Sequence, residues 1–193
     1  SRAFARPIKK LNEAAKHLTD GEFDFDIKTD LHDEIGELAS TFIETRKTLQ
    51  HQIYLLDTEA HRDGLTGVGN KSAFMDKEIE INHEIISGNA NFSVAVFDVN
   101  KLKVTNDIVG HMAGDKLLSP VSDHISASFG EADIFRIGGD EFVVILKNED
   151  STNCDALVTR CIEGMKNLSL EGYPECRVSC AYGASQFDVK IYH

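Results

Sequence analysis

The chain has 193 residues, with 20 Lys and Arg against 32 Asp and Glu, which gives a formal net charge of −12. Its hydrophobic fraction of 41% and charged fraction of 27% are ordinary for a globular protein, so intrinsic disorder is excluded as its class. An acidic chain lacks the clustered Lys and Arg that neutralise duplex phosphates, which excludes a nucleic-acid polymer as the main partner. A nucleotide bridged by a metal ion remains compatible, because carboxylates can hold the cation.

The cysteines and the apolar stretches also limit the class of protein. No stretch reaches the roughly 18 apolar residues of a membrane span, and Ser1 to Pro7 does not read as a signal peptide. We therefore expect this stretch to be soluble, and, since it begins without Met, to be a piece of a longer protein. We expect reduced, structural thiols, because the spacings match no zinc or redox motif. The four cysteines are Cys154, Cys161, Cys176 and Cys180.

The first 60 residues predict two helices joined by an extended connector. Apolar residues at 8, 11, 15 and 18 step by three and four, as in a coiled-coil seam, and Pro7 suits the first turn of that helix. The acidic stretch 22–33 follows a turn at Gly21, and Phe23, Phe25 and Ile27 alternate along it. A second seam follows, whose members are Ile35, Leu38, Phe42, Thr45, Leu49, Ile53, Leu56 and Ala60.

Such a narrow seam cannot bury itself in a monomer, so we expect a parallel dimer that forms a four-helix bundle. An amphipathic helix packed on its own domain is the alternative. Two consecutive steps of four, from Thr45 through Leu49 to Ile53, form a stutter, which locally unwinds a heptad coil. We hypothesise that a switch in coil twist acts there, and that replacing the stutter by a straight heptad alters activity.

Residues 7–15 (Pro-Ile-Lys-Lys-Leu-Asn-Glu-Ala-Ala), the Gly21 turn and residues 33–39 (Asp-Glu-Ile-Gly-Glu-Leu-Ala) resemble a HAMP signal-relay module. We assign residues 1–50 to this module and 51–62 to a coiled-coil signalling linker. The resemblance implies an upstream transmembrane sensor segment and a place on the cytoplasmic face of the bacterial inner membrane. Arg2 and Arg6 fit such a juxtamembrane position.

Residues 63–193 alternate between helical and strand-like patterns, with Asn70 placed to cap a helix. The Gly138-Gly139 pair joins two strand-like runs and predicts a hairpin. The fold class we expect is α+β, a mainly antiparallel central sheet flanked by helices. We expect helices at about 71–86, 101–129 (interrupted near 110–114) and 155–168, and strands at about 92–97, 133–137, 142–146 and 177–182.

Carboxylates stand where two of these strands end. Asp98 follows the first apolar strand, and Asp140 and Glu141 lie at the hairpin tip. If the hairpin lies beside the first strand, two or three carboxylates converge, and a hard cation such as Mg²⁺ is the usual answer to their repulsion. Gly138 and Gly139 allow positive φ and a close approach of substrate. A solvated Gly-Asp turn is the alternative for an isolated motif of this kind.

The run Gly138-Gly139-Asp140-Glu141-Phe142 matches the GGDEF signature letter for letter, and the chain resembles the diguanylate cyclase family. Three further blocks match in order and spacing, at 63–70 (Asp-Gly-Leu-Thr-Gly-Val-Gly-Asn), 98–107 (Asp-Val-Asn-Lys-Leu-Lys-Val-Thr-Asn-Asp) and 110–115 (Gly-His-Met-Ala-Gly-Asp). The resemblance implies a palm-like sheet in a homodimer that condenses two GTP into cyclic di-GMP and two pyrophosphates. It also implies Mg²⁺ or Mn²⁺, two ions per active site, and regulation through the HAMP-like module.

The resemblance also implies a role for each matching residue. The metal ligands are Asp98, the Val99 carbonyl, Asp140 and Glu141, of which the last two are also the catalytic candidates. Asn106 and Asp115 match the guanine readers, a pairing that suits the donors and acceptors of guanine. Phosphate contacts come from Lys103 and from the backbone N–H groups of residues 100–103, which open a helix. The remaining substrate-binding candidates are Asn100, Lys101, Leu102, Gly138 and Gly139.

Simpler interpretations remain open for some of these residues. Asp115 could cap the helix that follows, Asn106 could be a turn residue, and Lys103 could be a solvated helix lysine. His111 fits a structural role beneath the guanine pocket better than a catalytic one.

The chain also departs from the family pattern. Leu102 replaces an aromatic residue and Asn100 replaces a frequent Asp. Pro120 predicts a kink, or a helix that begins anew with Ser119 as its cap. The family's product-inhibition pattern, Arg-x-x-Asp, is replaced by residues 129–132 (Phe-Gly-Glu-Ala), so we predict no inhibition through that site. The family's last helix, with its phosphate-binding Lys and Arg, would begin where this sequence stops.

The leading hypothesis is an active cyclase. Two alternatives belong to other classes: a GTP-binding regulatory domain that controls a phosphodiesterase domain beyond residue 193, and a dimerisation protein without turnover.

Overall fold

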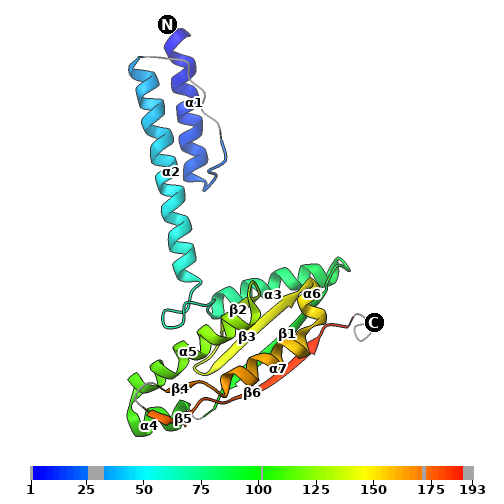
Figure 1. Cartoon of the computed structure of the whole chain (residues 1–193). Helices are drawn as coiled ribbons and strands as arrows, with labels where there is room; N and C mark the ends of the chain where they lie inside the picture. The colour runs from blue at the N-terminus through cyan, green and yellow to red at the C-terminus, as the bar shows by residue number, and fades with distance from the viewer. Residues whose placement is uncertain (1, 26–32, 101, 171–172, 189–193) are drawn as a thin grey trace. The chain divides into compact units, whose positions relative to one another are not determined.

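The structure is a computed structural model that describes residues 2–25, 33–100, 102–170 and 173–188. It divides into two compact units, residues 1–60 and 61–193 (Figure 1). The first unit is helical, and the second combines a sheet with helices.

The first unit is a helical hairpin of α1 (Arg2–Thr19) and α2 (Glu34–Ala60). The Asp33 carboxylate caps α2, accepting from the N–H groups of Ile35 and Gly36 at 3.1 Å each. Both predicted helices are confirmed, but Pro7 lies in the second turn of α1, because the helix already begins at Arg2. The small core consists of Leu11, Ala14 and Ala39, with Phe25, Ile35, Phe42 and Ile43 packed against it.

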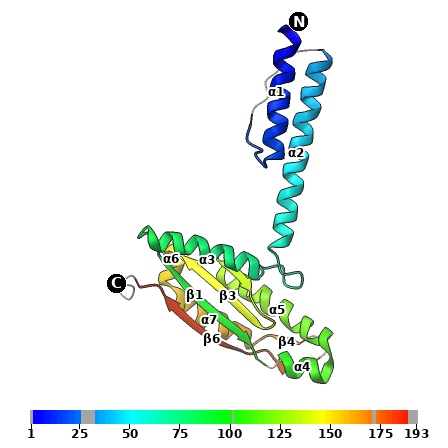
Figure 2. The same ribbon diagram turned by 180° about the vertical axis from the view of Figure 1, so that it is seen from behind.

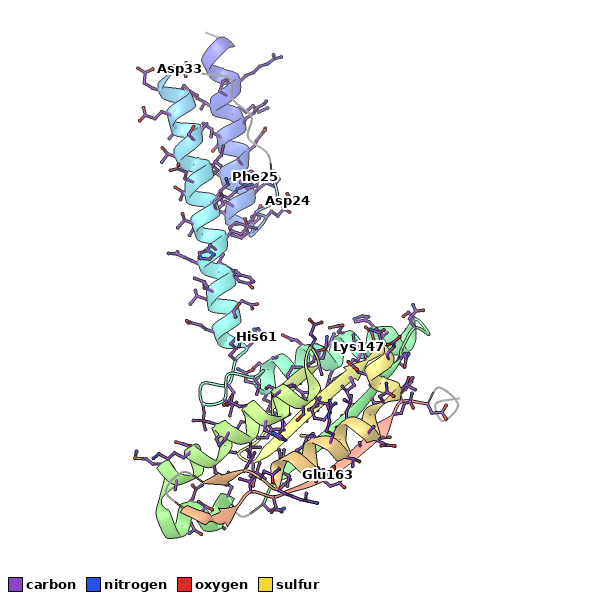
Figure 3. All side chains as sticks on the ribbon, in the orientation of Figure 1. Asp24, Phe25, Asp33, His61, Lys147 and Glu163 are labelled. Atoms are coloured by element: carbon purple, nitrogen blue, oxygen red, sulfur yellow. The ribbon has the colours of Figure 1, made fainter. Side chains whose placement is uncertain are left out.

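The described part of the connector is held by one side chain of α2. Arg46 Nη1 donates to the carbonyl oxygens of Phe23 (2.9 Å) and Phe25 (2.6 Å). The same guanidinium lies 5.2 Å from the centre of the Phe25 ring, a cation–π contact (the region labelled Phe25 in Figure 3). Ile27, the last member of the predicted alternation, falls outside the described residues.

Much of the predicted seam on α2 is not covered within the chain. Leu38 is 55% exposed, Ile53 50% and Leu56 66%. Contiguous exposed apolar surface of this kind marks an interaction face. The dimer therefore stays a prediction, and these side chains are where it would form. No helix in the described ranges is both long and apolar enough to cross a bilayer.

The second unit is built on one sheet with the strand order β2-β3-β1-β6, and every pairing in it is antiparallel. This confirms the predicted α+β class. The strands are β1 (Phe92–Val99), β2 (Asp133–Arg136), β3 (Glu141–Lys147) and β6 (Cys180–Gln186).

Helices cover both faces of this sheet, α3 (Lys71–Ile86) on one face and α5 (His111–Phe129) with α7 (Cys154–Met165) on the other (Figures 1 and 2). The α5/α7 side forms the main core around Phe97 and Phe142, both 0% exposed. A smaller core lies under α3. Its buried members are Ile81, Phe135, Val143 and Ile145.

Ion pairs and a cap fix α3 in place. Asn70 accepts from the N–H groups of Ser72 and Ala73, which confirms the predicted cap. Lys147 on β3 contacts two glutamates of α3 at 2.7 and 2.8 Å (Lys147 is labelled in Figure 3). The hydrogen bonds to Glu80 and then Glu84 raise the pKa of Lys147, so this pair stays charged at neutral pH.

The interruption predicted in the helical segment 101–129 is confirmed, since α4 (Leu102–Val109) and α5 are separated at Gly110 (φ +100°). Gly114, expected in the interruption, lies inside α5. The helix also runs through Pro120, so a new start at Ser119 is wrong. Ser119 Oγ instead donates to the Asp115 carbonyl oxygen at 3.4 Å.

The strand predicted over 177–182 is also two elements. β5 (Tyr173–Arg177) pairs with β4 (Ser169–Leu170) in a separate two-stranded sheet, and β6 begins at Cys180. The link is Val178, which is buried, and Ser179. Sequence patterns also missed the short α6 (Asn148–Thr152).

The thiols whose surroundings are described are free, namely Cys154, Cys161 and Cys180, as predicted. Burial raises the pKa of all three, and that of Cys180 to about 12. They are therefore protonated structural residues at neutral pH. The side chain of Cys176 lies outside the described part.

Candidate active site

Two carboxylates face each other where β1 ends and β3 begins. Asp98 stands directly opposite Glu141 in the antiparallel register, and both residues are exposed. Directly opposed residues share one face of a sheet, with Cβ atoms about 4.5–5.5 Å apart. Asp140 precedes Glu141 in the turn, and its carbonyl oxygen accepts from the Val99 N–H at 2.9 Å. The hairpin tip is thus attached to the end of β1, which meets the condition that the sequence analysis set for the carboxylates to converge.

The donor set of this site suits a shared metal ion better than a closed cage. In the described part of the chain, no group of three or more His, Cys, Asp or Glu side chains is arranged to hold a metal. Mg²⁺ is usually bound by one or two carboxylates together with water and substrate phosphates. Asp98 and Glu141 fit that pattern. Val99 has no polar side-chain atom, so its candidate ligand atom is the backbone oxygen alone.

The positive φ allowed for the two hairpin glycines is not used, because neither Gly138 nor Gly139 has positive φ. A Cβ on Gly138 would lie 2.7 Å from Oε2 of Glu141, so a side chain there would displace that carboxylate. A Cβ on Gly139 would meet nothing within 4 Å. The turn is open at Gly139, which leaves room for a ligand beside the backbone.

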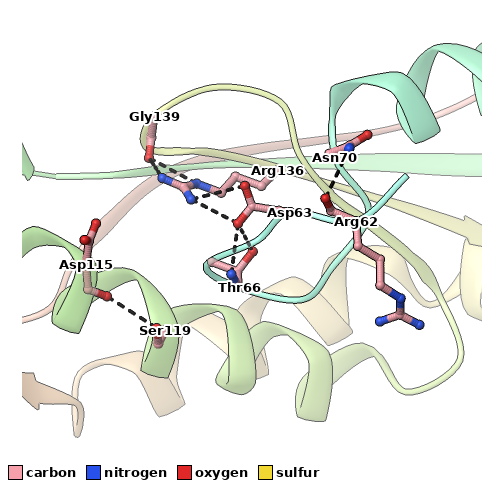
Figure 4. Close-up of polar contacts among 8 residues, drawn as sticks. All are labelled: Arg62, Asp63, Thr66, Asn70, Asp115, Ser119, Arg136 and Gly139. Atoms are coloured by element: carbon pink, nitrogen blue, oxygen red, sulfur yellow. Dashed lines mark hydrogen bonds and ion pairs between the residues drawn. The ribbon is translucent and has the colours of Figure 1, made fainter. Parts of the chain in front are cut away.

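An arginine braces this turn from the inside of the unit. Arg136 donates from Nη2 (2.8 Å) and Nε (3.3 Å) to the Gly139 carbonyl oxygen, and from Nη1 to Asp63 Oδ1 (3.0 Å) (Figure 4). Asp63 also accepts from the Thr66 N–H and hydroxyl. Sequence reasoning missed this brace. Its signals were an Arg two residues before Gly138 and an Asp-x-x-Thr turn in the entry segment.

The charge of Asp63 depends on these contacts. Burial alone would raise the pKa of Asp63, but hydrogen bonds from Thr66 and Arg136 outweigh it, and the pKa lies below its ordinary value. Asp63 is therefore ionised at neutral pH, and its pair with Arg136 links the entry segment 63–70 to the hairpin.

The turn that follows β1 is held by the link between β5 and β6. The Asn100 N–H donates to the Ser179 carbonyl oxygen at 2.9 Å, and Asn100 Nδ2 donates to Ser179 Oγ at 3.2 Å. The Asn100 N–H, predicted as a phosphate donor, is thus already occupied in this structure. Leu102 is buried and opens α4, and Lys103 is exposed on its first turn. Lys101 lies outside the described residues.

The two candidate guanine readers lie on neighbouring helices, Asn106 on α4 and Asp115 on α5. Asn106 Oδ1 is buried without a hydrogen-bond partner among the described residues. A Cβ on Gly114 would lie 2.0 Å from that oxygen, so glycine allows the two helices to meet there. An unpartnered buried acceptor is costly, which makes this oxygen a candidate acceptor for a donor from outside the described residues.

The simpler interpretations of these two residues are wrong. Asp115 does not cap α5, because Gly110 is the N-cap and Asp115 lies in the second turn, exposed. Asn106 is a helix residue rather than a turn residue. A solvated Lys103 remains compatible with its exposure. The side chain of His111 lies outside the described part, so its structural role stays a prediction.

An antiparallel α+β unit whose strand ends present paired carboxylates, and whose α4–α5 contact holds an unpartnered amide oxygen, is a candidate nucleotide-binding domain. Residues 60–189 match the family described as diguanylate cyclase, GGDEF domain, and residues 1–51 match the HAMP domain. The chain belongs to the GGDEF family, with a HAMP domain ahead of it.

Individual relatives carry different names. The chain is 30% identical over 147 residues to the cyclic di-GMP phosphodiesterase PdeR of Escherichia coli, covering 75% of this chain and 21% of that protein. It is 31% identical over 132 residues to the diguanylate cyclase DgcS of Shewanella oneidensis, covering 68% of this chain and 44% of that protein. The chain thus spans less than half the length of either relative.

The fold is shared with a solved structure, the coiled coil and GGDEF domain of DgcB from Caulobacter crescentus in complex with c-di-GMP. The TM-score is 0.70 at 22% identity, covering 80% of this chain and 83% of that chain.

Proposed function

We propose that this protein is a diguanylate cyclase, which condenses two GTP into cyclic di-GMP and two pyrophosphates. The observation that carries the proposal is the pairing of Asp98 with Glu141 in register, with Asp140 in the adjoining turn. Family membership and a relative named as a diguanylate cyclase support it. In this proposal Asp98, the Val99 carbonyl, Asp140 and Glu141 hold Mg²⁺ or Mn²⁺, which neutralises charge on the phosphates.

The protein's own groups would orient the nucleotide. Asn106 Oδ1 would accept a hydrogen bond from guanine, which relieves its buried, unpartnered state. Asp115 would accept from the guanine N1–H and N2–H₂ donors, and Lys103 would contact phosphate. Asp140 or Glu141 would take the proton of the attacking 3′-hydroxyl. Gly139 leaves space for the nucleotide at the turn.

Each unit would hold one GTP, so turnover requires two copies facing each other, and positioning supplies most of the catalysis. We propose that the exposed α2 face, with Ile53 and Leu56, forms a homodimer that brings the half-sites together. An upstream membrane-bound sensor would act through the HAMP domain. A twist at the Leu49–Ile53 stutter would then change the distance between the half-sites.

The test is mass spectrometry of the products after incubation with GTP and Mg²⁺. We expect cyclic di-GMP from the wild-type protein and a loss of at least about 100-fold in Asp98→Asn, Glu141→Gln and Asp140→Ala. Asp123→Asn, which changes an exposed carboxylate on α5, is the matched control and should keep full activity. Wild-type turnover in Asp98→Asn would contradict the site.

GTP binding without product would contradict the cyclase and favour the second candidate, a GTP-binding regulatory domain for a phosphodiesterase. The similarity to a relative named as a cyclic di-GMP phosphodiesterase supports this second candidate. The same assay with added cyclic di-GMP tests product inhibition. Phe129 is 3% exposed and packs on Phe97, so its side chain is not available to a ligand, and we expect no inhibition through 129–132.

A further inference from the structure

The turn after β1 is held in place by hydrogen bonds from neighbouring segments of the proposed site. It joins a buried strand to α4 and offers no side-chain packing at Asn100, which is exposed. The carbonyl of Val99 and the first N–H groups of α4 are backbone groups. Their positions relative to a ligand can change only if the backbone of the turn moves. Whatever fixes this turn therefore fixes where the triphosphate and its metal ion would lie.

Two neighbouring segments fix it. From the hairpin side, the Asp140 carbonyl oxygen accepts from the Val99 N–H at 2.9 Å. From the opposite side, Ser179 makes two hydrogen bonds to Asn100, one through its carbonyl oxygen (2.9 Å) and one through its hydroxyl (3.2 Å). Ser179 is adjacent to Val178, which is 4% exposed in the main core, so its backbone is anchored.

The side-chain bond also orients the amide of Asn100. The Asn100 Nδ2 group can only donate, so the Ser179 hydroxyl is the acceptor in this bond. Both described hydrogen bonds of Asn100 are thus made to Ser179. This assigns Asn100 to fixing the turn and leaves phosphate contacts to the N–H groups further on and to Lys103.

We propose that Ser179 is a positioning residue for the phosphate-binding turn, acting through Asn100 and not by touching the nucleotide. The inference rests on the proposed function, because it assumes that this turn receives the triphosphate. It predicts a defect specific to the β- and γ-phosphates. Guanine recognition by Asn106 and Asp115, on helices beyond the turn, should be unaffected.

The test compares Ser179→Ala, Ser179→Thr and Ser185→Ala, the last an exposed serine of β6 as the matched control. GTP and GMP affinities are measured by calorimetry with Mg²⁺, cyclase kinetics by product formation, and melting temperature by circular dichroism. Loss of one neutral hydrogen bond predicts a GTP dissociation constant and KM raised about threefold to tenfold in Ser179→Ala. GMP affinity, kcat and melting temperature should change little.

The threonine variant keeps the hydroxyl and should restore GTP affinity. Asn100→Ala removes the other partner of the same bond, so adding it to Ser179→Ala should give little further loss in GTP affinity. Equal GTP affinity in wild type and Ser179→Ala, or equal losses for GMP and GTP, would overturn the inference. If the wild-type protein binds GTP without product, the cyclase fails, but the affinity comparison still decides the role of Ser179.

Discussion

The two units of the chain bury their apolar residues to different extents. The unit of residues 61–193 surrounds Phe97, Phe142 and Leu118 completely. Among its described residues, the unit of residues 1–60 has three buried apolar side chains, Leu11, Ala14 and Ala39, and an exposed row along α2. The unit of residues 61–193 can be stable alone, because its apolar core is already removed from water. In the proposed homodimer, a second copy of the helical hairpin would cover the row. The stability of the hairpin would then depend on protein concentration, while that of the other unit would not.

The largest test of this comparison is Phe97→Ala. Phe97 is 0% exposed and contacts Phe129 edge-on, so truncation leaves a cavity and should cost about 3–5 kcal/mol of unfolding free energy. Urea unfolding followed by circular dichroism measures it. Val96→Ala is the control on the same strand, since Val96 is 41% exposed, and should cost less than about 1 kcal/mol. Equal costs for the two variants would mean that this sheet face is not the stabilising core.

A second, smaller effect is expected at the α2 row. Ile53→Ala removes apolar surface that a dimer would bury, and should weaken dimerisation by about tenfold or more, since a buried Ile is worth about 1.5–3 kcal/mol. Sedimentation equilibrium measures the dimer constant. Gln52→Ala, exposed one residue away on the same helix, serves as the control. An unchanged constant in Ile53→Ala would place the dimer contact elsewhere.

The smallest effect concerns the pair where the chain enters the second unit. Asp63 has a pKa below 3.8 when folded, so its contribution to stability is present above pH 3.8 and is lost as the pH falls through the folded-state value. Solvent screens the pair, so the loss should be no more than about 1 kcal/mol. Urea unfolding at pH 6 and pH 3 should show a smaller pH difference in Asp63→Asn than in wild type. An identical difference would show that Asp63 does not contribute.

The sequence predicted most of the sheet because β1 and β3 carry nearly continuous apolar runs, and because an unambiguous Gly-Gly turn joins β2 to β3. It failed at 177–182, where Val178 and Ser179 continue a strand-like pattern. The chain turns there because Val178 enters the core and Ser179 binds Asn100, 79 residues away in sequence. Local pattern carries no information about such a partner.

The candidate site, like the sheet, was predictable from local sequence patterns but not where it depends on contacts between distant residues. The register that places Asp98 opposite Glu141 follows from the hairpin lying beside β1, which the sequence suggested as a condition. The contact of Arg136 with Asp63 joins residues 73 apart, and no periodicity indicates it. Likewise, the collision that a side chain at Gly114 would make with Asn106 appears only when α4 and α5 are placed together.

The rate at which the cysteines are alkylated can measure local opening of the second unit. All four cysteines lie between residues 154 and 180, and none lies in the helical hairpin. Cys154 and Cys161 on α7 are buried, and Cys180, with a pKa of about 12, is almost wholly protonated at neutral pH. An alkylating reagent can therefore modify Cys154 and Cys161 only when α7 opens, and it reacts slowly with Cys180, which is only half-buried but protonated. Labelling rates with and without GTP then read out how far a bound nucleotide tightens the second unit, whatever the hairpin does.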